Sequence, residues 1–423
     1  MVIFIIVVFF ILMLMGIPIA FVLGLTPFIY WIIEGGVPSI IFPQRMFSGS
    51  SSFVLMAIPF FVLAGNLMSY GGVTKRIIAF TQAIVGNISG GLGVVNVVSS
   101  MLFGGISGSA NADVAALGTA LIPEMVNEGY DVEFSTAITV TSATVGPIIP
   151  PSISMVIYGS LANVSIGALF LGGIIPGILI GLFLIILVLI KSSFSHYPRT
   201  GRFSFKLIKS TFKDAILALV MPILIVGGIL SGAFTPTEAS AVAVVYAFVV
   251  GCFIYKGFKI KDLFKIVVKS VVVSASILII ISFTCVIGWI IAEVRIPQLL
   301  GEWLLSITDN KYLILMFINL ILLLMGTTLD PSAGLILFTP ILIPIAKLVG
   351  INPIHLGVIM VLNLTIGLTT PPVGTCLYIG STISKLPVQK LFVAMIPYLI
   401  SNIIVLLLIT YMPQLVLFLA LKI

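Results

Sequence analysis

Charged residues are scarce in this chain of 423 residues. Asp, Glu, Lys and Arg make up 8% of it, whereas 60% of it is hydrophobic. An average soluble domain carries about 25% charged residues, so this chain cannot cover itself with a polar surface. The composition excludes a secreted, cytosolic or nucleic-acid-binding protein and indicates a polytopic protein of the lipid bilayer. At about 20 residues per transmembrane helix, the length allows roughly 10 to 14 membrane segments.

Cysteine and histidine are also rare. The 3 cysteines stand singly in apolar runs, and the 2 histidines, His196 and His355, have no Cys or His nearby in the sequence. No transition-metal site is therefore expected. The sequence also lacks a Ser/His/Asp set, an H-E-x-x-H motif and a phosphate-binding loop. These absences argue against an enzyme and an ATP-driven pump, and they leave an ion gradient as the source of energy.

The basic residues predict the topology. Eleven of the 20 Lys and Arg residues lie in two stretches, 191–213 and 256–269. The positive-inside rule places both stretches in the cytoplasm as loops between spans. Counting outward from them predicts membrane spans near 3–23, 24–42, 53–70, 133–158, 166–190, 215–232, 238–255, 270–292, 354–378 and 391–421.

Two further apolar stretches, 90–127 and 311–347, are interrupted near their middles by small polar residues. Each half is expected to be too short to cross a bilayer as a helix. We interpret the two stretches as re-entrant helical hairpins whose tips lie at membrane depth. On the predicted topology, the first enters from the cytoplasm and the second from outside.

Two predicted spans contain a helix-breaking sequence. Residues 146–151 read Gly-Pro-Ile-Ile-Pro-Pro, and residues 367–372 read Gly-Leu-Thr-Thr-Pro-Pro. Proline removes a backbone donor from a helix, and glycine tolerates unwound backbone. Each span is therefore predicted to open in its middle, which a bilayer permits only where protein or a water-filled cavity satisfies the backbone.

These features recur at one spacing. Gly367 follows Gly146 by 221 residues, and Asp330 follows Ser109 by the same number. We interpret the halves as a diverged duplication that enters the membrane from opposite sides. Such an inverted repeat is typical of secondary transporters, with sites at the midplane. The alternative, that Gly and Pro only permit close helix packing, explains one cluster more easily than four at a single spacing.

The predicted fold is an all-α polytopic membrane protein with an inverted repeat, two re-entrant helical hairpins and two broken transmembrane helices. The expected divisions are scaffold helices and an arm in 1–85, the first half of a transport domain in 86–165, connecting and scaffold helices in 166–310, the second transport half in 311–380 and a C-terminal helix in 381–423.

The hairpin tips and broken spans are rich in small oxygen-bearing side chains. Freed carbonyls and hydroxyls suit a hard cation. Half-helix N-termini suit an anion. Together they predict coupled binding of a cation such as Na⁺ and an anionic solute. The candidate solute-binding residues of the tips and broken spans are Ser109, Asn111, Thr327, Thr328, Ser332 and Thr369.

The two acids of the tips, Asp113 and Asp330, have two interpretations. An ionisable residue at membrane depth is a functional candidate. Each acid is equally well placed to cap the second helix of its hairpin. The sequence leaves both interpretations open.

Several motifs together resemble one known family. They are 57–61 with 64–66, 106–109 with Ala112-Asp113, 129–131, 146–152, 235–239 and 367–372. On these motifs, and over nearly its whole length, the chain resembles the large membrane subunit (M, or DctM-type) of tripartite ATP-independent periplasmic (TRAP) transporters.

The resemblance implies a Na⁺-coupled elevator in the bacterial cytoplasmic (inner) membrane. It also implies a small four-helix membrane partner (Q type) and an extracytoplasmic solute-binding protein that delivers a carboxylate-bearing solute. Because no segment precedes the first predicted span, the Q partner is expected as a separate chain. By motif, one Na⁺ site would use Ser107 with backbone oxygens of Gly146, Ile149 and Pro151, and the second would use Gly326, Gly367, Thr370 and Val373.

Three alternatives remain at this point. A stand-alone Na⁺/divalent-anion symporter would need no binding protein, but its tips usually carry Ser-Asn-Thr triplets, which neither tip has here. An intramembrane enzyme would show clustered His, Asp or basic residues. A passive channel would need no paired hairpins. The solute is expected to be of the sialic acid or C4-dicarboxylate class, and general similarity favours sialic acid.

Overall fold

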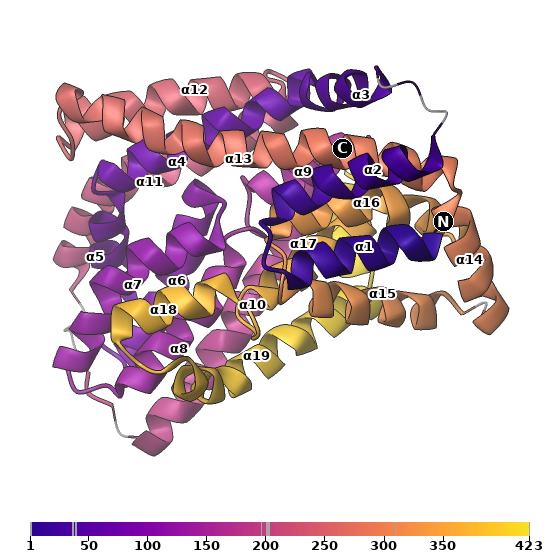
Figure 1. The fold of residues 1–423 in the computed structure, drawn as a ribbon. Helices are drawn as coiled ribbons and strands as arrows, with labels where there is room; N and C mark the ends of the chain where they lie inside the picture. Colours follow the sequence, from indigo (N-terminus) through magenta and orange to yellow (C-terminus); the bar gives the residue numbers. More distant parts are fainter. Residues whose placement is uncertain are drawn as a thin grey trace.

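The computed structural model describes residues 2–35, 38, 40–195, 197–199, 204–308 and 310–422. These residues form helices joined by turns, and no strand occurs among them (Figure 1). Seven helical stretches are apolar and long enough to cross a membrane. They are Phe53–Tyr70, Ile166–Ser195, Phe205–Leu230, Pro236–Ile254, Ile260–Glu293, Pro331–Leu348 and Val388–Tyr411. The predicted all-helical, membrane-spanning character is thereby confirmed.

Long helices form one side of the molecule. Helix α12 (Pro236–Phe248) continues as a π-helix, η3 (Val249–Ile254), and the long α13 (Ile260–Glu293) follows after a turn (Figure 1). Helix α4 (Ala57–Tyr70) packs on both α12 and α13. The other helices outside the two hairpins and the two broken spans are η1 (Phe53–Met56), α3 (Ile41–Ser50), α5 (Val73–Val85), α10 (Ile166–Ser195), α11 (Phe205–Leu230) and α14 (Ile296–Ile307), besides those at the two ends of the chain.

Both predicted hairpins are helix–turn–helix units. The first consists of α6 (Gly91–Ser107) and α7 (Ala110–Asn127), and the second of α15 (Lys311–Gly326) and α16 (Pro331–Leu348). The two units occupy opposite halves of the molecule in Figure 1. The expectation that every half is too short to span is wrong for α16, because this helix continues through its internal prolines to Leu348.

Both predicted breaks are confirmed. Helix α8 (Val132–Ser142) and the short η2 (Ala143–Val145) end before a non-helical segment, and α9 (Ile153–Ala162) follows it. In the other half, α17 (Pro353–Gly367) and α18 (Thr375–Ser384) flank the second break. Two adjacent prolines occupy each break and prevent a continuous ladder of helical hydrogen bonds. The peptide bonds Pro150–Pro151 and Pro371–Pro372 are cis.

The N-terminal spans were predicted wrongly. Instead of helices over 3–23 and 24–42, the chain forms α1 (Val2–Leu14) and α2 (Ile19–Glu34), which pack on each other. The chain turns between them at Gly16, whose φ is +77°, and Pro18 precedes the first turn of α2. A positive φ is a glycine conformation, and Pro18 has no N–H to continue a helix.

The C-terminal division, 381–423, also differs from the expectation. It holds α19 (Val388–Tyr411) and a short α20 (Gln414–Ala420) beyond the end of α18, where a single helix was expected. Helix α19 ends just before Met412-Pro413. Pro413 cannot donate a backbone hydrogen bond, so the helix stops there and restarts.

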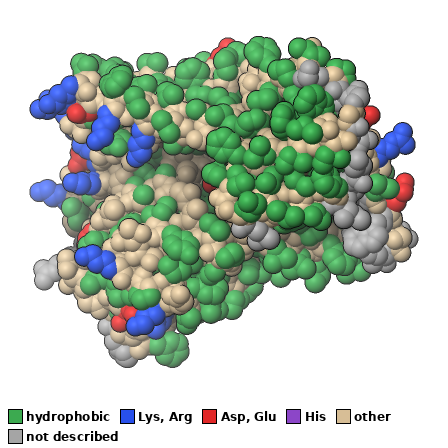
Figure 2. All heavy atoms as spheres, in the orientation of Figure 1, with side chains coloured by type: hydrophobic (Ala, Val, Ile, Leu, Met, Phe, Trp, Pro, Cys, Tyr) green, Lys and Arg blue, Asp and Glu red, His purple; other side chains and the backbone are tan. Residues whose placement is uncertain are grey.

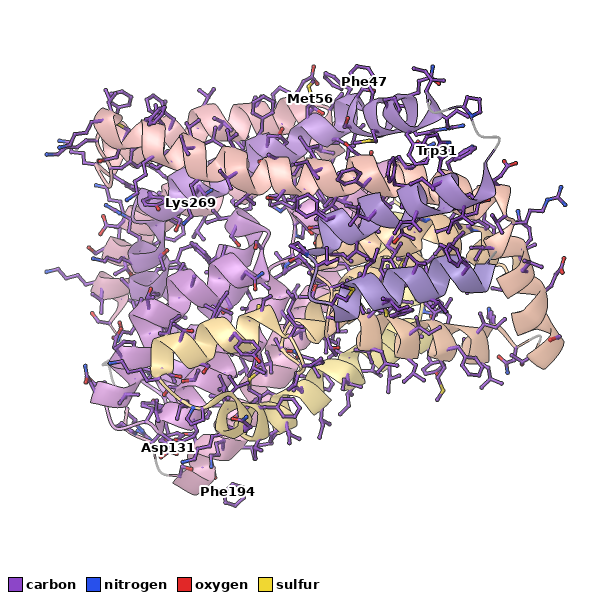
Figure 3. The ribbon with its side chains drawn as sticks, in the orientation of Figure 1. Trp31, Phe47, Met56, Asp131, Phe194 and Lys269 are labelled. Carbon is purple, nitrogen blue, oxygen red and sulfur yellow. The ribbon has the colours of Figure 1, made fainter. Side chains whose placement is uncertain are left out.

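The loops in the two basic stretches, 191–213 and 256–269, are shorter than predicted. Helix α11 begins at Phe205 and α13 at Ile260, so most lysines of the two stretches lie on helix ends. Lysine stems can lie along apolar surface while their ammonium groups reach water. Most Lys and Arg side chains visible in Figure 2 gather at one end of the molecule, and hydrophobic side chains cover much of the remaining view. Phe47 and Met56 project outward from the side of the molecule that α12 and α13 form (Figure 3).

Candidate functional site

Each hairpin meets a broken span through paired glycines. A Cβ atom on Gly104 would lie 2.6 Å from the Cα atom of Gly146. In the other half, a Cβ atom on Gly367 would overlap the carbonyl carbon of Gly326. Real Cβ atoms do not approach other heavy atoms so closely. The first helix of each hairpin therefore lies backbone to backbone against the end of α8–η2 or of α17.

A buried carboxylate lies at the first of these contacts. Asp113, in the first turn of α7, is 0% exposed. Its Oδ1 atom accepts a hydrogen bond from the Ser107 hydroxyl, while Oδ2 has no hydrogen-bond partner among the described residues. Oδ2 lies directly against Gly146, where a Cβ atom would overlap it. A buried carboxylate oxygen without a partner is costly, and a proton or a cation would offset the cost.

The other members of the first predicted Na⁺ set lie on the segment that packs against the hairpin turn. Gly108 adopts a φ of +61° at the hairpin turn, and a Cβ there would lie 3.0 Å from the carbonyl oxygen of Pro151. Ile149 belongs to the same non-helical segment as Pro151. The structure thus brings Ser107 and the segment from Gly146 to Pro151 together. Sequence reasoning did not include Asp113 in this set.

The second predicted Na⁺ set is also brought together, around the other hairpin turn. The backbone N–H groups of Val373 and Gly374 donate to the carbonyl oxygen of Thr327, at 3.1 and 3.2 Å. The Thr370 hydroxyl donates to the carbonyl oxygen of Ile366 at 3.2 Å. Backbone and hydroxyl oxygens therefore dominate this cluster.

The two acids of the tips occupy different environments. Asp330 is the N-cap residue of α16, and its carboxylate accepts a hydrogen bond of 2.9 Å from the backbone N–H of Ser332. Asp113 is not the cap of α7, because Ser109 occupies the N-cap position. Asp330 is exposed, whereas Asp113 is buried. Capping thus describes Asp330 and not Asp113.

A direct hydrogen bond links the two halves of the chain. Oδ1 of Asn111, at the start of α7, accepts from the hydroxyl of Thr375 at 2.9 Å and from Sγ of Cys376 at 3.1 Å. The start of the first hairpin's second helix therefore lies beside the start of α18. Sequence reasoning named Asn111 but had no signal for its contact with Thr375.

Most residues predicted to bind the solute are partly accessible. Five of the six are half-buried, namely Ser109, Asn111, Thr327, Thr328 and Ser332. The sixth, Thr369, is fully buried. The Thr369 hydroxyl donates to the carbonyl oxygen of Ile366 at 2.6 Å. Thr369 is thus the one member whose side chain a solute cannot touch in this conformation.

Four helices begin at this centre: α7, α9, α16 and α18. The bond from Thr375 to Asn111 joins the starts of α18 and α7, and a Cβ on Gly108 would lie 3.3 Å from the backbone nitrogen of Ile153, where α9 starts. Helix α16 packs on α9. Helix N-termini carry free N–H groups and partial positive charge, which favour an anion. The centre therefore combines anion-binding helix ends with oxygen clusters suited to cations.

Among the described residues, no group of three His, Cys, Asp or Glu side chains could hold a metal ion. His355 is buried, and its Nε2 atom lies 2.7 Å from the carbonyl oxygen of Ile409. His196 lies outside the described residues.

Comparison with known proteins gives consistent results. The sequence model of the family described as "Tripartite ATP-independent periplasmic transporter, DctM component" matches residues 6–415. The chain is 42% identical to the uncharacterized protein YgiK of Salmonella typhimurium over 96% of this chain and 94% of that one. It is 40% identical to the sialic acid TRAP transporter large permease protein SiaM of Vibrio cholerae, over 94% of this chain and 93% of that one.

A third relative carries a different substrate in its name. It is the C4-dicarboxylate TRAP transporter large permease protein DctM of Rhodobacter capsulatus, 37% identical over 95% of this chain and 94% of that one. Among solved structures, the YdaH transporter of Alcanivorax borkumensis superposes with a TM-score of 0.61 at 14% identity, and 87% of each chain is covered. That likeness shows a shared fold.

Proposed function

The chain belongs to the family of the DctM component of tripartite ATP-independent periplasmic transporters, and on that premise we propose that it is the large membrane subunit of a Na⁺-coupled importer of an organic anion. The family consists of transport proteins rather than enzymes. The observation that supports Na⁺ coupling most strongly is the unpartnered Oδ2 atom of the buried Asp113.

The first cluster supports Na⁺ as the co-transported ion. Na⁺ is a hard cation and prefers oxygen ligands. Asp113 offers a negative oxygen. The Ser107 hydroxyl donates to that carboxylate and accepts from the backbone N–H of Ser109 at 3.2 Å, which leaves one lone pair for an ion. The second cluster, around Thr370, offers neutral oxygens. We expect a Na⁺ ion in each cluster, with the tighter site at Asp113.

The helix starts support an anionic solute. No Lys or Arg lies in either hairpin tip, so the charge of a carboxylate would be balanced by helix ends and by the Na⁺ ions. The half-buried hydroxyls of Ser109, Thr327 and Thr328 would bind the polar groups of the solute. Relatives named for sialic acid and for C4-dicarboxylates support a solute of one of these two classes. We propose sialic acid as the first solute to test.

The repeated architecture supports an elevator mechanism with inverted repeats. Helices α7 and α16 begin 221 residues apart, and α9 and α18 begin 222 residues apart. Helix α18 packs on α7, and α9 packs on α16, so each hairpin contacts the broken span of the other half. Such crossed packing would let both hairpins move as one body against α4, α11, α12 and α13.

Two partners complete the proposed system. A small four-helix membrane subunit of the Q type would enlarge the stationary part. An extracytoplasmic solute-binding protein would deliver the anion to the outer face. The complex would lie in the cytoplasmic (inner) membrane of a bacterium.

Uptake into proteoliposomes tests this proposal. The chain and its small partner are reconstituted, and uptake of labelled sialic acid or a C4-dicarboxylate is measured with and without an inward Na⁺ gradient and with and without the binding protein. Uptake that requires both supports the proposal. Na⁺-driven uptake without the binding protein would indicate a stand-alone symporter instead, and gradient-independent flux would indicate a channel.

A further inference from the structure

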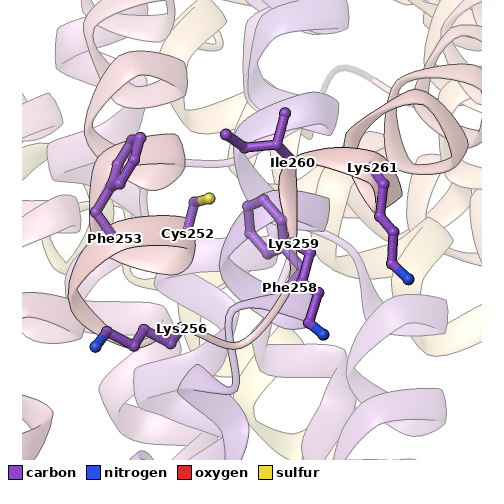
Figure 4. A pocket seen from close by; sticks show the side chains of 7 residues that line it. All are labelled: Cys252, Phe253, Lys256, Phe258, Lys259, Ile260 and Lys261. Atoms are coloured by element: carbon purple, nitrogen blue, oxygen red, sulfur yellow. The ribbon is translucent and has the colours of Figure 1, made fainter.

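A second binding surface lies away from the hairpins, where α12 turns into α13. The groove has a volume of about 580 Å³ and opens to the surface (Figure 4). Its lining residues come from η3, the following turn and the start of α13. They are Cys252, Phe253, Lys256, Phe258, Lys259, Ile260 and Lys261. None of them belongs to the proposed transport site.

The backbone that shapes the groove is held by close glycine contacts. A Cβ on Gly71 would lie 2.9 Å from the Cα atom of Gly251, and a Cβ on Gly257 would overlap the backbone of Gly71. The turn after η3 therefore packs tightly on the turn between α4 and α5. Phe258 is 6% exposed and anchors the floor of the groove. The groove is a preformed feature of the fold.

A tyrosine next to the groove ties the turn to two further helices. The Tyr255 hydroxyl donates to the carbonyl oxygen of Asp214 on α11 at 2.7 Å. The guanidinium carbon of Arg76 on α5 lies 3.8 Å from the centre of the Tyr255 ring. Such cation–π contacts stabilise the arrangement. The groove is thus supported from α4, α5 and α11.

The groove has a charged side and an apolar side. In Figure 4, the ammonium ends of Lys256 and Lys259 point to one side, while Phe253 and Ile260 point to the other. Phe253 is 55% exposed and Ile260 is 63% exposed. Within the part of the chain that the structure describes, no ion pair engages the lysines of the groove. The nearby Asp262 carboxylate instead accepts from the backbone N–H of Lys259 at 3.0 Å.

We propose that this groove binds the headgroup phosphate of an anionic phospholipid. The lysine ammonium groups would bind the phosphodiester, and the acyl chains would lie on Phe253 and Ile260. Lysine-rich pockets at the cytoplasmic ends of membrane helices attract anionic lipids. The basic stretch 256–269 places this groove at the cytoplasmic leaflet. A free phosphate would satisfy the ammonium groups equally well but would make no contact with the apolar side.

Lipid retention by the purified full chain tests the proposal. Native mass spectrometry compares phosphatidylglycerol with phosphatidylcholine on the wild type and on the groove variant Lys256→Gln/Lys259→Gln/Lys261→Gln. The matched control is Lys206→Gln/Lys209→Gln/Lys213→Gln, which removes the same number of exposed charges from the start of α11. We expect selective retention of phosphatidylglycerol, weakened about fivefold for each groove lysine removed, and retention near wild type in the control. Equal loss in both variants would overturn the proposal.

Cysteine labelling gives an independent measurement on the wild-type protein, in which the groove lysines are unchanged. Cys252 lines the groove, whereas Cys285 does not, and both are partly exposed. In nanodiscs, phosphatidylglycerol should slow maleimide labelling of Cys252 relative to phosphatidylcholine and leave Cys285 unchanged. Equal labelling of Cys252 in both lipids contradicts the proposal. Protection by millimolar inorganic phosphate in phosphatidylcholine discs, equal to that by phosphatidylglycerol, would identify a free-phosphate site and overturn the assignment to lipid.

Discussion

A Cβ atom on Gly367 would overlap the carbonyl carbon of Gly326, so these two residues lie backbone to backbone. Gly104 and Gly146 make the corresponding contact in the other half of the chain. Each contact holds the turn of a hairpin against the opened part of a broken span. The proposed Na⁺ clusters are built at these two contacts and depend on the absence of side chains there.

Replacing Gly367 by alanine should therefore disrupt the second cluster. The new methyl group would force α15 and α17 apart, and overpacking of this kind costs about 1–3 kcal/mol. We expect Gly367→Ala to lower the melting temperature and to abolish Na⁺-driven uptake. Gly288→Ala on α13 is the control, because a Cβ there has nothing within 4 Å. Equal stability of the two variants would contradict the close contact.

Asp113→Asn should separate ion binding from folding. The amide keeps the size of the side chain and removes the charge whose Oδ2 atom has no partner. We expect the variant to fold, because burying an unpaired charge is unfavourable, and to lose the stabilisation that Na⁺ gives. The measurement is the shift in melting temperature between Na⁺ and K⁺, since a ligand of the native state raises stability. An unchanged shift in Asp113→Asn would remove Asp113 from the site, and Asp262→Asn serves as the control.

Ser107→Ala and Thr370→Ala test one hydroxyl ligand in each cluster. Losing a polar partner in a buried site costs about 1–3 kcal/mol, so we expect the half-saturating Na⁺ concentration to rise about tenfold in each variant. The measurement is uptake at varied Na⁺ concentration. Thr119→Ala is the control, because the exposed Thr119 hydroxyl bonds only to the carbonyl oxygens of its own helix. Unchanged half-saturation in both variants would refute the site assignment.

The environment of Tyr197 should make the free energy of unfolding depend on pH. Burial, and then the hydrogen bond to Asp131, raise the pKa of Tyr197 above its usual value. Its hydroxyl donates to Oδ2 of Asp131 at 2.5 Å, and its ring stacks on Tyr130 with centroids 4.5 Å apart. Asp131 lies at one corner of the molecule (Figure 3). Because the folded state favours the protonated phenol, this stabilisation is complete below about pH 10 and is lost as the pH rises further.

Tyr197→Phe should remove that pH dependence. We expect a loss of about 1.5–3 kcal/mol near neutral pH, typical of a hydrogen bond to a charged group, and a smaller difference from the wild type above about pH 10. Chemical unfolding in detergent at several pH values gives the measurement. Tyr312→Phe, at an exposed tyrosine, is the control. A difference between wild type and Tyr197→Phe that does not shrink at high pH would contradict the account.

The sequence predicted the parts of the fold that single residues dictate. Pro150-Pro151 and Pro371-Pro372 break their helices wherever the rest of the chain lies, so both breaks could be placed beforehand. The turn at Gly16 to Pro18 was missed, although its signal is of the same kind. Because the apolar run continues across this turn, hydropathy alone predicted one continuous span over 3–23.

Contacts between distant segments could not be predicted in the same way. The approach of Gly104 to Gly146 depends on how two helices cross, and the bond from Thr375 to Asn111 depends on how the halves pack. Neither is encoded in a local pattern. For the same reason, the sequence could not show that Ser109, and not Asp113, is the N-cap residue of α7.

Simultaneous flux of solute and ion is the most direct test of the central claim. Proteoliposomes holding the chain, its small partner and the binding protein are supplied with ¹⁴C-labelled sialic acid and ²²Na⁺ in one experiment. We predict that solute entry is accompanied by Na⁺ entry in a fixed ratio, and that Asp113→Asn abolishes both. Solute entry without any accompanying Na⁺ would contradict the Na⁺-coupled account.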